Sequence, residues 1–184
     1  MNNSTALLVI DIQDSFKISP ARWAGRSTPR FEENVTKLLR LWRETGQPVI
    51  FFLHNDNDPG FRVGDPEVRL MDFIDRRENE PLLTKNTRNA FTSTDLEARL
   101  QALGVRKLAV CGITTEQCCE TTTRVANDVY GYDVDFITDA TMTFPIGDLP
   151  ADEIIRRTEA VLRGRFARIV TVDQVEEEVA AFAK

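Results

Sequence analysis

The stretch that decides the fold is ALLVIDIQ, residues 6–13. Its continuous apolar run is typical of a strand that is covered on both faces of a parallel sheet, so we expect a buried strand over residues 6–12. Asp11 stands near the end of that run, where burying a carboxylate costs free energy unless another group pairs with it or uses it. A turn or helix-capping aspartate is the alternative interpretation of this residue.

Short β-rich runs alternate with helical segments along the rest of the chain. The predicted strands span residues 6–12, 48–54, 82–85, 107–112, 133–138 and 167–172. The predicted helices span residues 29–45, 66–73, 94–103, 115–130 and 150–163, and a last helix begins at 173. This alternation predicts an α/β fold, a three-layer doubly wound sandwich with helices on both faces of a six-stranded, mostly parallel sheet. Ligands of such folds bind beyond the carboxyl ends of the strands.

Length and composition indicate one globular domain spanning residues 1–184. Apolar residues make up 42% and charged residues 28%, which excludes a disordered or low-complexity chain. The formal net charge of −6 disfavours nucleic acid and anionic membrane surfaces as partners, because both call for clustered Lys and Arg. The longest apolar runs hold about five residues, far short of the roughly 20 that a membrane helix needs. The partner that we expect is therefore a small-molecule substrate.

The cysteine count and the start of the chain both point to a reducing compartment. Three cysteines are too few, and an odd number, for a disulfide framework. Residues 1–5 lack the basic segment and the small-residue cleavage site of a signal peptide. We therefore expect a cytoplasmic protein.

Metal and cofactor motifs are missing from the sequence. His54 is the single histidine, and the cysteines lack paired ligand spacing, which excludes the usual zinc sites. The glycines form neither a G-x-G-x-x-G dinucleotide motif nor a phosphate loop, and there is no G-x-S-x-G nucleophile elbow. We expect neither a metal nor a cofactor.

Two further strand ends carry reactive groups. Lys85 ends the third predicted strand, although a solvated surface lysine is the ordinary interpretation. Thr115 is a helix N-cap candidate that places Cys118 in the first helical turn, where free N–H groups and the helix dipole favour a thiolate. Helical spacing does not separate Cys118 from Cys119 as the reactive residue. A small buried hydrophobe is the alternative interpretation of both, and the one that we favour for Cys111.

A cysteine nucleophile without a neighbouring histidine needs another base. Asp11, at the end of the first predicted strand, is the natural candidate for that base. Lys85 would supply positive charge beside it.

Three separated segments carry motifs that fit together. Residues 8–16, LVIDIQDSF, form a strand that ends in D-x-Q-x-x-F. Residues 85–96, KNTRNAFTSTDL, match K-x-x-x-S-A-F…T-x-L, with Asn89 where Ser is common. Residues 112–132 match G-x-x-T-x-x-C-V-x-x-T-x-x-x-A…G-Y. In this order and spacing they resemble, over about residues 6–175, the isochorismatase-like cysteine hydrolases. That family includes nicotinamidases, N-carbamoylsarcosine amidohydrolases and ureidoacrylate-type amidohydrolases.

The resemblance implies the strand order 3-2-1-4-5-6 and a catalytic triad. Asp11 matches the family's catalytic base, Lys85 its catalytic lysine and Cys118 its nucleophile. Cys119 falls where the family usually has Val, so the resemblance favours Cys118. The D-x-H metal site of nicotinamidases has no counterpart here, because residues 52–56 read FLHND and no other histidine exists.

The resemblance also implies a cis peptide bond between Ile113 and Thr114. This bond would aim the backbone N–H groups of Thr114 and Cys118 at a substrate oxygen and form an oxyanion hole. A homo-oligomer, either a dimer or a tetramer, is implied by the same resemblance.

The reaction that the resemblance implies is hydrolysis of an amide or ureido C–N bond in a small molecule, through a thioester on Cys118. The alternative is vinyl-ether hydrolysis of the isochorismatase type, with Asp11 as general acid and no thioester. Its dicarboxylate substrate would need basic side chains, for which Arg22, Arg62 and Arg88 are available. A non-enzymatic α/β domain with a vestigial site is the third interpretation.

Candidates for substrate contact come from the loops that follow the strands. Gln13 belongs to the first strand-end motif, and Phe16, Trp23 and Phe61 stand in or beside these loops, as does Phe144. Packing in the core or in a subunit contact is the alternative interpretation of each aromatic residue.

Overall fold

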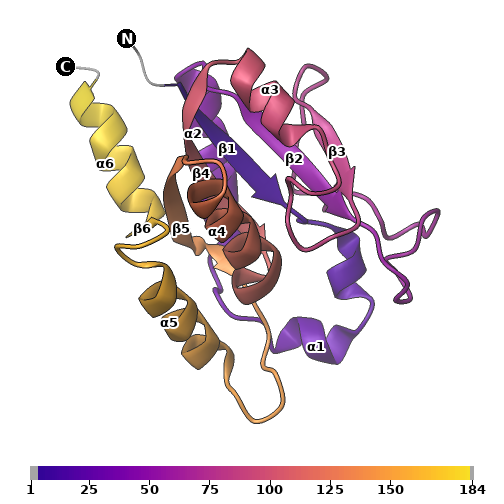
Figure 1. Ribbon diagram of the computed structural model, residues 1–184. Coiled ribbons are helices and arrows are strands. Elements are labelled where there is room, and N and C mark those ends of the chain that lie inside the picture. The colour runs from indigo at the N-terminus through magenta and orange to yellow at the C-terminus, as the bar shows by residue number, and fades with distance from the viewer. Residues whose placement is uncertain (1–3, 183–184) are drawn as a thin grey trace.

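A six-stranded sheet lies at the centre of the computed structural model, which describes residues 4–182 (Figure 1). The strands are β1 (Ser4–Ile10), β2 (Val49–His54), β3 (Leu82–Lys85), β4 (Val105–Ile113), β5 (Asp133–Met142) and β6 (Arg168–Val170). They lie in the order β3-β2-β1-β4-β5-β6, and all neighbouring strands are parallel. The predicted order is confirmed, and the sheet is wholly rather than mostly parallel.

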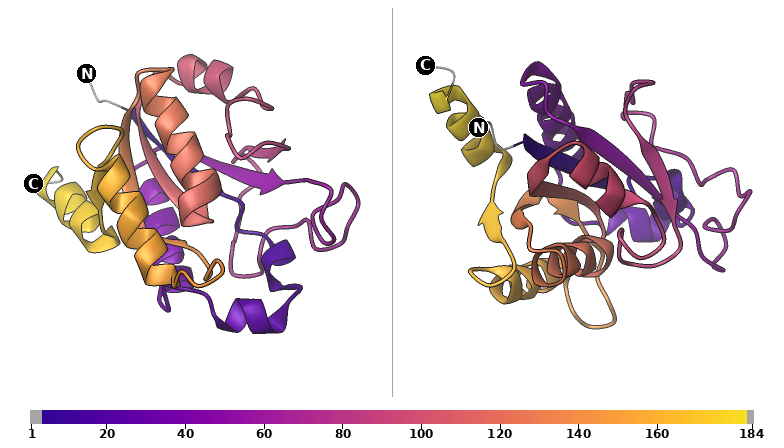
Figure 2. Two further views of the ribbon diagram at one scale, coloured as in Figure 1. Left: turned by 60° about the horizontal axis from the view of Figure 1, so that its bottom comes forward. Right: turned by 45° about the horizontal axis from the view of Figure 1, so that its top comes forward.

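Helices cover both faces of this sheet, as predicted. The helices are α1 (Pro20–Ala24), α2 (Phe31–Glu44), α3 (Leu96–Ala102), α4 (Glu120–Asp128), α5 (Ala151–Leu162) and α6 (Val172–Phe182). A 3-10 helix, η1 (Asp14–Lys17), follows β1, and a π-helical turn, η2 (Thr115–Cys119), precedes α4. In Figures 1 and 2, α2 and α6 lie on one face of the sheet, and α3, α4 and α5 lie on the other. None of the helices within residues 4–182 has the length and apolar character needed to cross a membrane.

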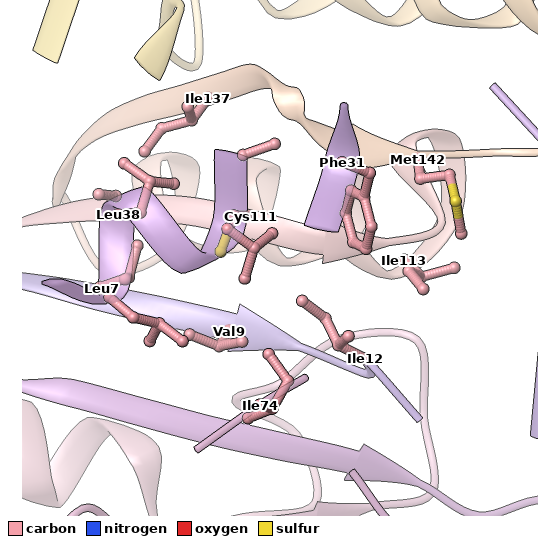
Figure 3. Packing of buried hydrophobic residues seen from close by; sticks show 14 of the residues in the cluster. Leu7, Val9, Ile12, Phe31, Leu38, Ile74, Cys111, Ile113, Ile137 and Met142 are labelled. Carbon is pink, nitrogen blue, oxygen red and sulfur yellow. The ribbon is translucent and has the colours of Figure 1, made fainter. Parts of the chain in front are cut away.

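Two apolar cores separate the helices from the sheet. Side chains of β1 alternate between them, because successive residues of a strand point to opposite faces. Leu7 and Val9 enter the core under α2, which Figure 3 shows together with Leu38 and the buried Cys111. Leu8 enters the core under α3 and α4. The continuous apolar run that predicted a doubly covered strand is thus buried as expected.

The predicted helices differ from the structure in several places, of which two have a clear physical cause. The helix predicted over residues 29–45 begins at Phe31, because Thr28 has a left-handed φ of 56° and its hydroxyl donates to the distant Thr141 carbonyl. The helix predicted over residues 66–73 does not form. There the Ser15 N–H donates to the Glu67 carbonyl and Asp14 N–H to that of Arg69, so these carbonyls bond across the fold rather than along a helix.

Gly112 lies where β1 and β4 approach each other closely. It pairs with Ile10 in the sheet register and has a φ of 132°, which side chains rarely tolerate. A methyl group on Gly112 would overlap the carbonyl oxygen of Ile10. This close approach brings the chain after β1 and the turn after β4 to one place.

We expect Gly112→Ala to lower the free energy of unfolding by about 3 kcal/mol or more, because it adds both a backbone overlap and conformational strain. Gly46→Ala is the matched control, since Gly46 also has a positive φ, of 67°, but open space around it. The control should cost about 1 kcal/mol. Urea unfolding of both variants measures the difference, and equal losses would contradict the role given to this close approach.

Candidate active site

Three strand ends bring an acid, an amine and a thiol into contact. Asp11 directly follows β1, Lys85 is the last residue of β3, and Cys118 lies in η2 after β4. The Lys85 Nζ lies 2.7 Å from Asp11 Oδ2 and donates to Cys118 Sγ at 3.3 Å. The residues are 0%, 1% and 5% exposed, respectively, so only Cys118 reaches the surface to a small extent. The structure thus places together the residues that the sequence proposed as a triad.

Lys85 reaches Asp11 across the end of β2. Two strand spacings, about 10 Å, separate β3 from β1. His54 ends β2 and pairs in register with Lys85, so the lysine side chain passes over the carboxyl end of the intervening strand. Asp11 has a φ of 51°, in the left-handed region that non-glycine residues seldom adopt. The chain bends at this residue as it leaves the sheet, at the point where the ion pair forms.

Lys85 carries its charge in spite of its burial. Burial acts to lower the pKa of this ammonium, but the attraction of Asp11 and Cys118 outweighs it, and the pKa lies above its ordinary value. The ammonium also donates to the Thr87 carbonyl at 3.1 Å. The Asp11 oxygens accept no hydrogen bond of ordinary geometry from residues 4–182, so the ion pair is the main compensation for burying this carboxylate.

The Cys118 thiol holds its proton more tightly than a free cysteine does. Burial raises its pKa above the ordinary value, the Asp11 carboxylate raises it further, and Lys85 opposes both. This raised pKa differs from the lowered pKa, and hence the thiolate, that a position in the first helical turn favours. The reason is that Cys118 lies in a buried π-helical turn beside a carboxylate, and these two effects outweigh the nearby cation. The resting site therefore pairs a protonated thiol with a neighbouring acceptor for its proton.

Asp11, His54 and Cys118 would also be a plausible set of metal ligands by residue type, because their ligand atoms lie within 4.8 Å of one another. The Lys85 ammonium, however, lies 2.7 Å from Asp11 Oδ2, 3.2 Å from His54 Nδ1 and 3.3 Å from Cys118 Sγ. A metal ion bound by these three atoms would have to displace the ammonium. The donor set therefore fits the lysine and does not fit a metal while Lys85 holds this position.

The turn before Cys118 contains the cis peptide bond between Ile113 and Thr114 that the family resemblance implied. The Thr114 carbonyl accepts hydrogen bonds from the N–H groups of Gln117, at 3.3 Å, and Cys119, at 3.2 Å. The Thr114 hydroxyl donates to Glu116 Oε1 at 3.0 Å, and the Thr143 hydroxyl donates to Glu116 Oε2 at 2.6 Å. Sequence reasoning missed Glu116, because no motif marks it and Thr143 is distant in the chain.

Gln13 joins the ends of β1 and β2. Its side-chain oxygen accepts from the His54 N–H at 2.7 Å, and its amide nitrogen donates to the His54 carbonyl at 3.0 Å and to Ser15 Oγ at 2.7 Å. The side chain is fully buried. Its amide is occupied by bonds within the protein, and its contact with substrate stays a prediction.

The aromatic candidates form one connected group that extends away from His54. The ring centroid of Phe61 lies 6.3 Å from that of His54 and 5.1 Å from that of Phe16. Phe16 stacks against Phe144, which in turn contacts Trp23. Phe16 and Phe144 are buried, while Phe61 and Trp23 are partly exposed. Among the aromatic candidates, Phe61 is therefore the one beside His54, which contacts Lys85. Trp23 lies at the other end of the aromatic group.

Two surface hollows of about 490 Å³ and 550 Å³ lie at the amino ends of the strands, opposite the triad. The first is lined by the starts of β4, β5 and β6, and the second by the starts of β1 and β2. The triad lies at the carboxyl ends of the strands, where ligands of doubly wound folds bind. These hollows therefore belong to a different face from the chemistry.

We expect Asp11→Asn to lower the pKa of the Cys118 thiol and Lys85→Met to raise it, because the carboxylate opposes and the ammonium favours the thiolate. The alkylation rate of Cys118 by iodoacetamide, followed against pH by mass spectrometry, measures this pKa. Asp14→Asn is the control, since Asp14 pairs with Lys17 and Arg69 instead. A thiol that titrates at higher pH in Asp11→Asn than in the unmodified protein would contradict the electrostatics described here.

Comparison with known proteins agrees with this geometry. The Isochorismatase domain family model matches residues 5–174 of the chain. The isochorismatase family protein YrdC of Bacillus subtilis is 31% identical over 182 residues, which cover 95% of this chain and 96% of YrdC. Nicotinamidase 3 of Arabidopsis thaliana is 30% identical over 189 residues, covering 95% of this chain and 88% of that protein. The crystal structure of an isochorismatase-family hydrolase from Chromobacterium violaceum is similar with a TM-score of 0.89 and 30% identity, covering 98% and 95% of the two chains. The chain therefore belongs to the isochorismatase family of hydrolases.

Proposed function

We propose that this protein hydrolyses an amide or ureido C–N bond of a small molecule through a thioester on Cys118. The observation that carries the proposal is the contact of one buried ammonium, that of Lys85, with both the Asp11 carboxylate at 2.7 Å and the Cys118 sulfur at 3.3 Å. A base, a cation and a nucleophile in contact are the parts that covalent acyl transfer needs.

In the first half of the reaction, Asp11 accepts the proton of the Cys118 thiol while the sulfur attacks the substrate's carbonyl carbon. The thiol, whose pKa burial and Asp11 raise, gives up its proton to Asp11 as the sulfur attacks. The carbonyl oxygen becomes an oxyanion that the backbone N–H groups of Thr114 and Cys118 would stabilise, each by roughly 3–4 kcal/mol. Asp11 then gives the proton to the leaving nitrogen, the C–N bond breaks, and a thioester remains.

In the second half, water attacks the thioester and Asp11 accepts its proton. The C–S bond breaks, the acid product leaves, and the sulfur recovers a proton from Asp11. Lys85 stays protonated throughout, as its raised pKa requires, and it lies against both groups whose charge changes. Its role is electrostatic, because an ammonium with a raised pKa is a poor proton donor at neutral pH.

One comparison supports C–N bond cleavage. A relative that covers most of this chain is named as a nicotinamidase, and nicotinamide is an amide. The metal site that the resemblance associates with nicotinamidases lacks its histidines here, since residues 52–56 hold His54 alone. We therefore propose an amide or ureido substrate that binds without such a metal.

Cys118→Ala should reduce turnover of a cleaved amide or ureido acid by about a thousandfold or more, because it removes the atom that forms the thioester. A panel of small amides, ureido acids and isochorismate, tested by product release, identifies the substrate on which to measure this. Acid quenching during turnover should trap an acyl adduct on Cys118, detected by intact mass.

Cys119→Ala is the matched control, because Cys119 is the neighbouring buried cysteine and should leave the acyl adduct in place. Hydrolysis of isochorismate with no trappable adduct on Cys118 would instead favour the vinyl-ether reaction with Asp11 as general acid. Turnover of an amide that survives Cys118→Ala would refute the proposed mechanism.

A further inference from the structure

Arg88 extends from the loop after β3 to the neighbours of the triad. Its Nη1 lies 2.5 Å from His54 Nε2, and its Nε donates to the side-chain oxygen of Gln117 at 3.3 Å. His54 contacts Lys85 on its other side, and Gln117 precedes Cys118 in the chain. The guanidinium thus contacts a neighbour of Lys85 and the residue before Cys118, while its side chain remains 44% exposed. Resemblance to the family assigns no role to this position, because it falls at an unspecified residue of the K-x-x-x-S-A-F segment.

Protein contacts leave part of this guanidinium unused. Arginine has five N–H donors, and the contacts with His54, Gln117 and Asp56 use three of them. Two N–H groups therefore have no partner within residues 4–182. Asp56 Oδ2 lies 3.4 Å from Nη2, beyond the 2.7–2.9 Å of a strong charge-assisted bond, and it also lies 3.2 Å from His54 Nε2. The Asp56 carboxylate is thus shared between Arg88 and His54, and it lies too far from Arg88 for a strong hydrogen bond.

The contact between Arg88 and His54 is also in competition with Lys85. Burial lowers the pKa of His54, and the charges of Lys85 and Arg88 lower it further, so the ring is neutral at neutral pH. A neutral imidazole has one acceptor nitrogen, yet Lys85 lies at Nδ1 and Arg88 lies at Nε2. Lys85 is fixed by its ion pair with Asp11, so the Arg88 contact is the one that a better acceptor can replace.

A second arrangement of the same groups relieves the contact between Arg88 and His54. If Arg88 moves to an anion, the His54 Nε2–H can donate to Asp56 Oδ2, already 3.2 Å away, while Nδ1 stays unprotonated toward the Lys85 ammonium. The two remaining N–H groups of Arg88 and the released Nη1–H suit the forked geometry of a carboxylate. Binding an anion therefore removes the competition at His54 and adds a charge-assisted contact for Arg88.

We propose that Arg88 binds a carboxylate of the substrate and thereby selects small anionic amides or ureido acids over neutral ones. The inference rests on the proposed function, because it takes the reacting carbonyl to lie at Cys118. The guanidinium is separated from the sulfur by His54 and Lys85, so it would hold the far end of a short substrate while the carbonyl meets the thiol. Arg88 is a specificity-determining residue in this scheme and takes no part in the bond changes.

Two alkylating reagents of nearly equal shape test the inference without knowledge of the substrate. Iodoacetate carries a carboxylate and iodoacetamide carries a neutral amide; in both cases the sulfur displaces iodide and the thiol proton is released. The measured quantity is the ratio of the two rates at Cys118, each divided by the rate with a small free thiol. We expect Arg88→Gln to lower this ratio about tenfold, the value of one charge-assisted contact.

Arg99→Gln is the matched control for charge. Arg99 lies on α3 with a side chain 42% exposed, close to the 44% of Arg88, and it pairs with Asp95 away from the triad. Its replacement should leave the ratio unchanged. A merely structural role of Arg88 would change both rates together and leave the ratio as it is, and that result would overturn the inference.

Ligand binding separates the failure of this inference from the failure of the proposed function. In Cys118→Ser, the anion malonamate should raise the melting temperature and neutral malonamide should not, and the added Arg88→Gln change should abolish the difference. If Cys118 resists both alkylating reagents but malonamate still stabilises through Arg88, the hydrolase mechanism fails and the carboxylate site stands. If malonamate stabilises equally with and without Arg88, the carboxylate site fails and the mechanism is unaffected.

Discussion

The buried ion pair between Lys85 and Asp11 is the interaction on which the rest of the site depends. Both side chains are fully buried, and removing one partner of such a pair costs about 3–5 kcal/mol because it leaves a buried charge uncompensated. The pair forms only if the chain after β1 and the end of β3 lie at the same edge of the sheet with β2 between them. The parallel order of the sheet therefore brings the two buried charges together, so that each compensates the other.

Polar residues around the ion pair hold the strand ends at the required separation. Gln13 bonds both backbone groups of His54 and so ties the end of β1 to the end of β2. On the far side of β1, Glu120 anchors the start of α4, directly after the turn that carries Cys118. Its oxygens accept from Arg124, Arg157 and the Thr158 hydroxyl. The thiol is thus placed by bonds to α5 as well as by the strand that precedes it.

Most of the sheet was predictable because its inner strands β1, β2 and β4 are mostly apolar and buried, which the sequence displays directly. The failures have a common physical cause. Residues 66–73 have helical patterning, but the carbonyls of Glu67 and Arg69 bond to the segment after β1, a partner that local sequence does not reveal. The raised pKa of Cys118 likewise escaped prediction, since a local helix position cannot report burial or the neighbouring carboxylate of Asp11. Tertiary contacts outweighed local preference in both cases.

The sequence by itself determined the alternating α/β class, the buried first strand and the resemblance that linked Asp11, Lys85 and Cys118, because hydrophobic period and motif spacing are local properties of a chain. Only the tertiary structure decided that the ammonium touches both other groups, and that His54 lies between Lys85 and Arg88. Those contacts join residues tens of positions apart, and their distances depend on strand order and register. Charge, in particular, acts through space, so its effect on the thiol exists only once the strand ends have met.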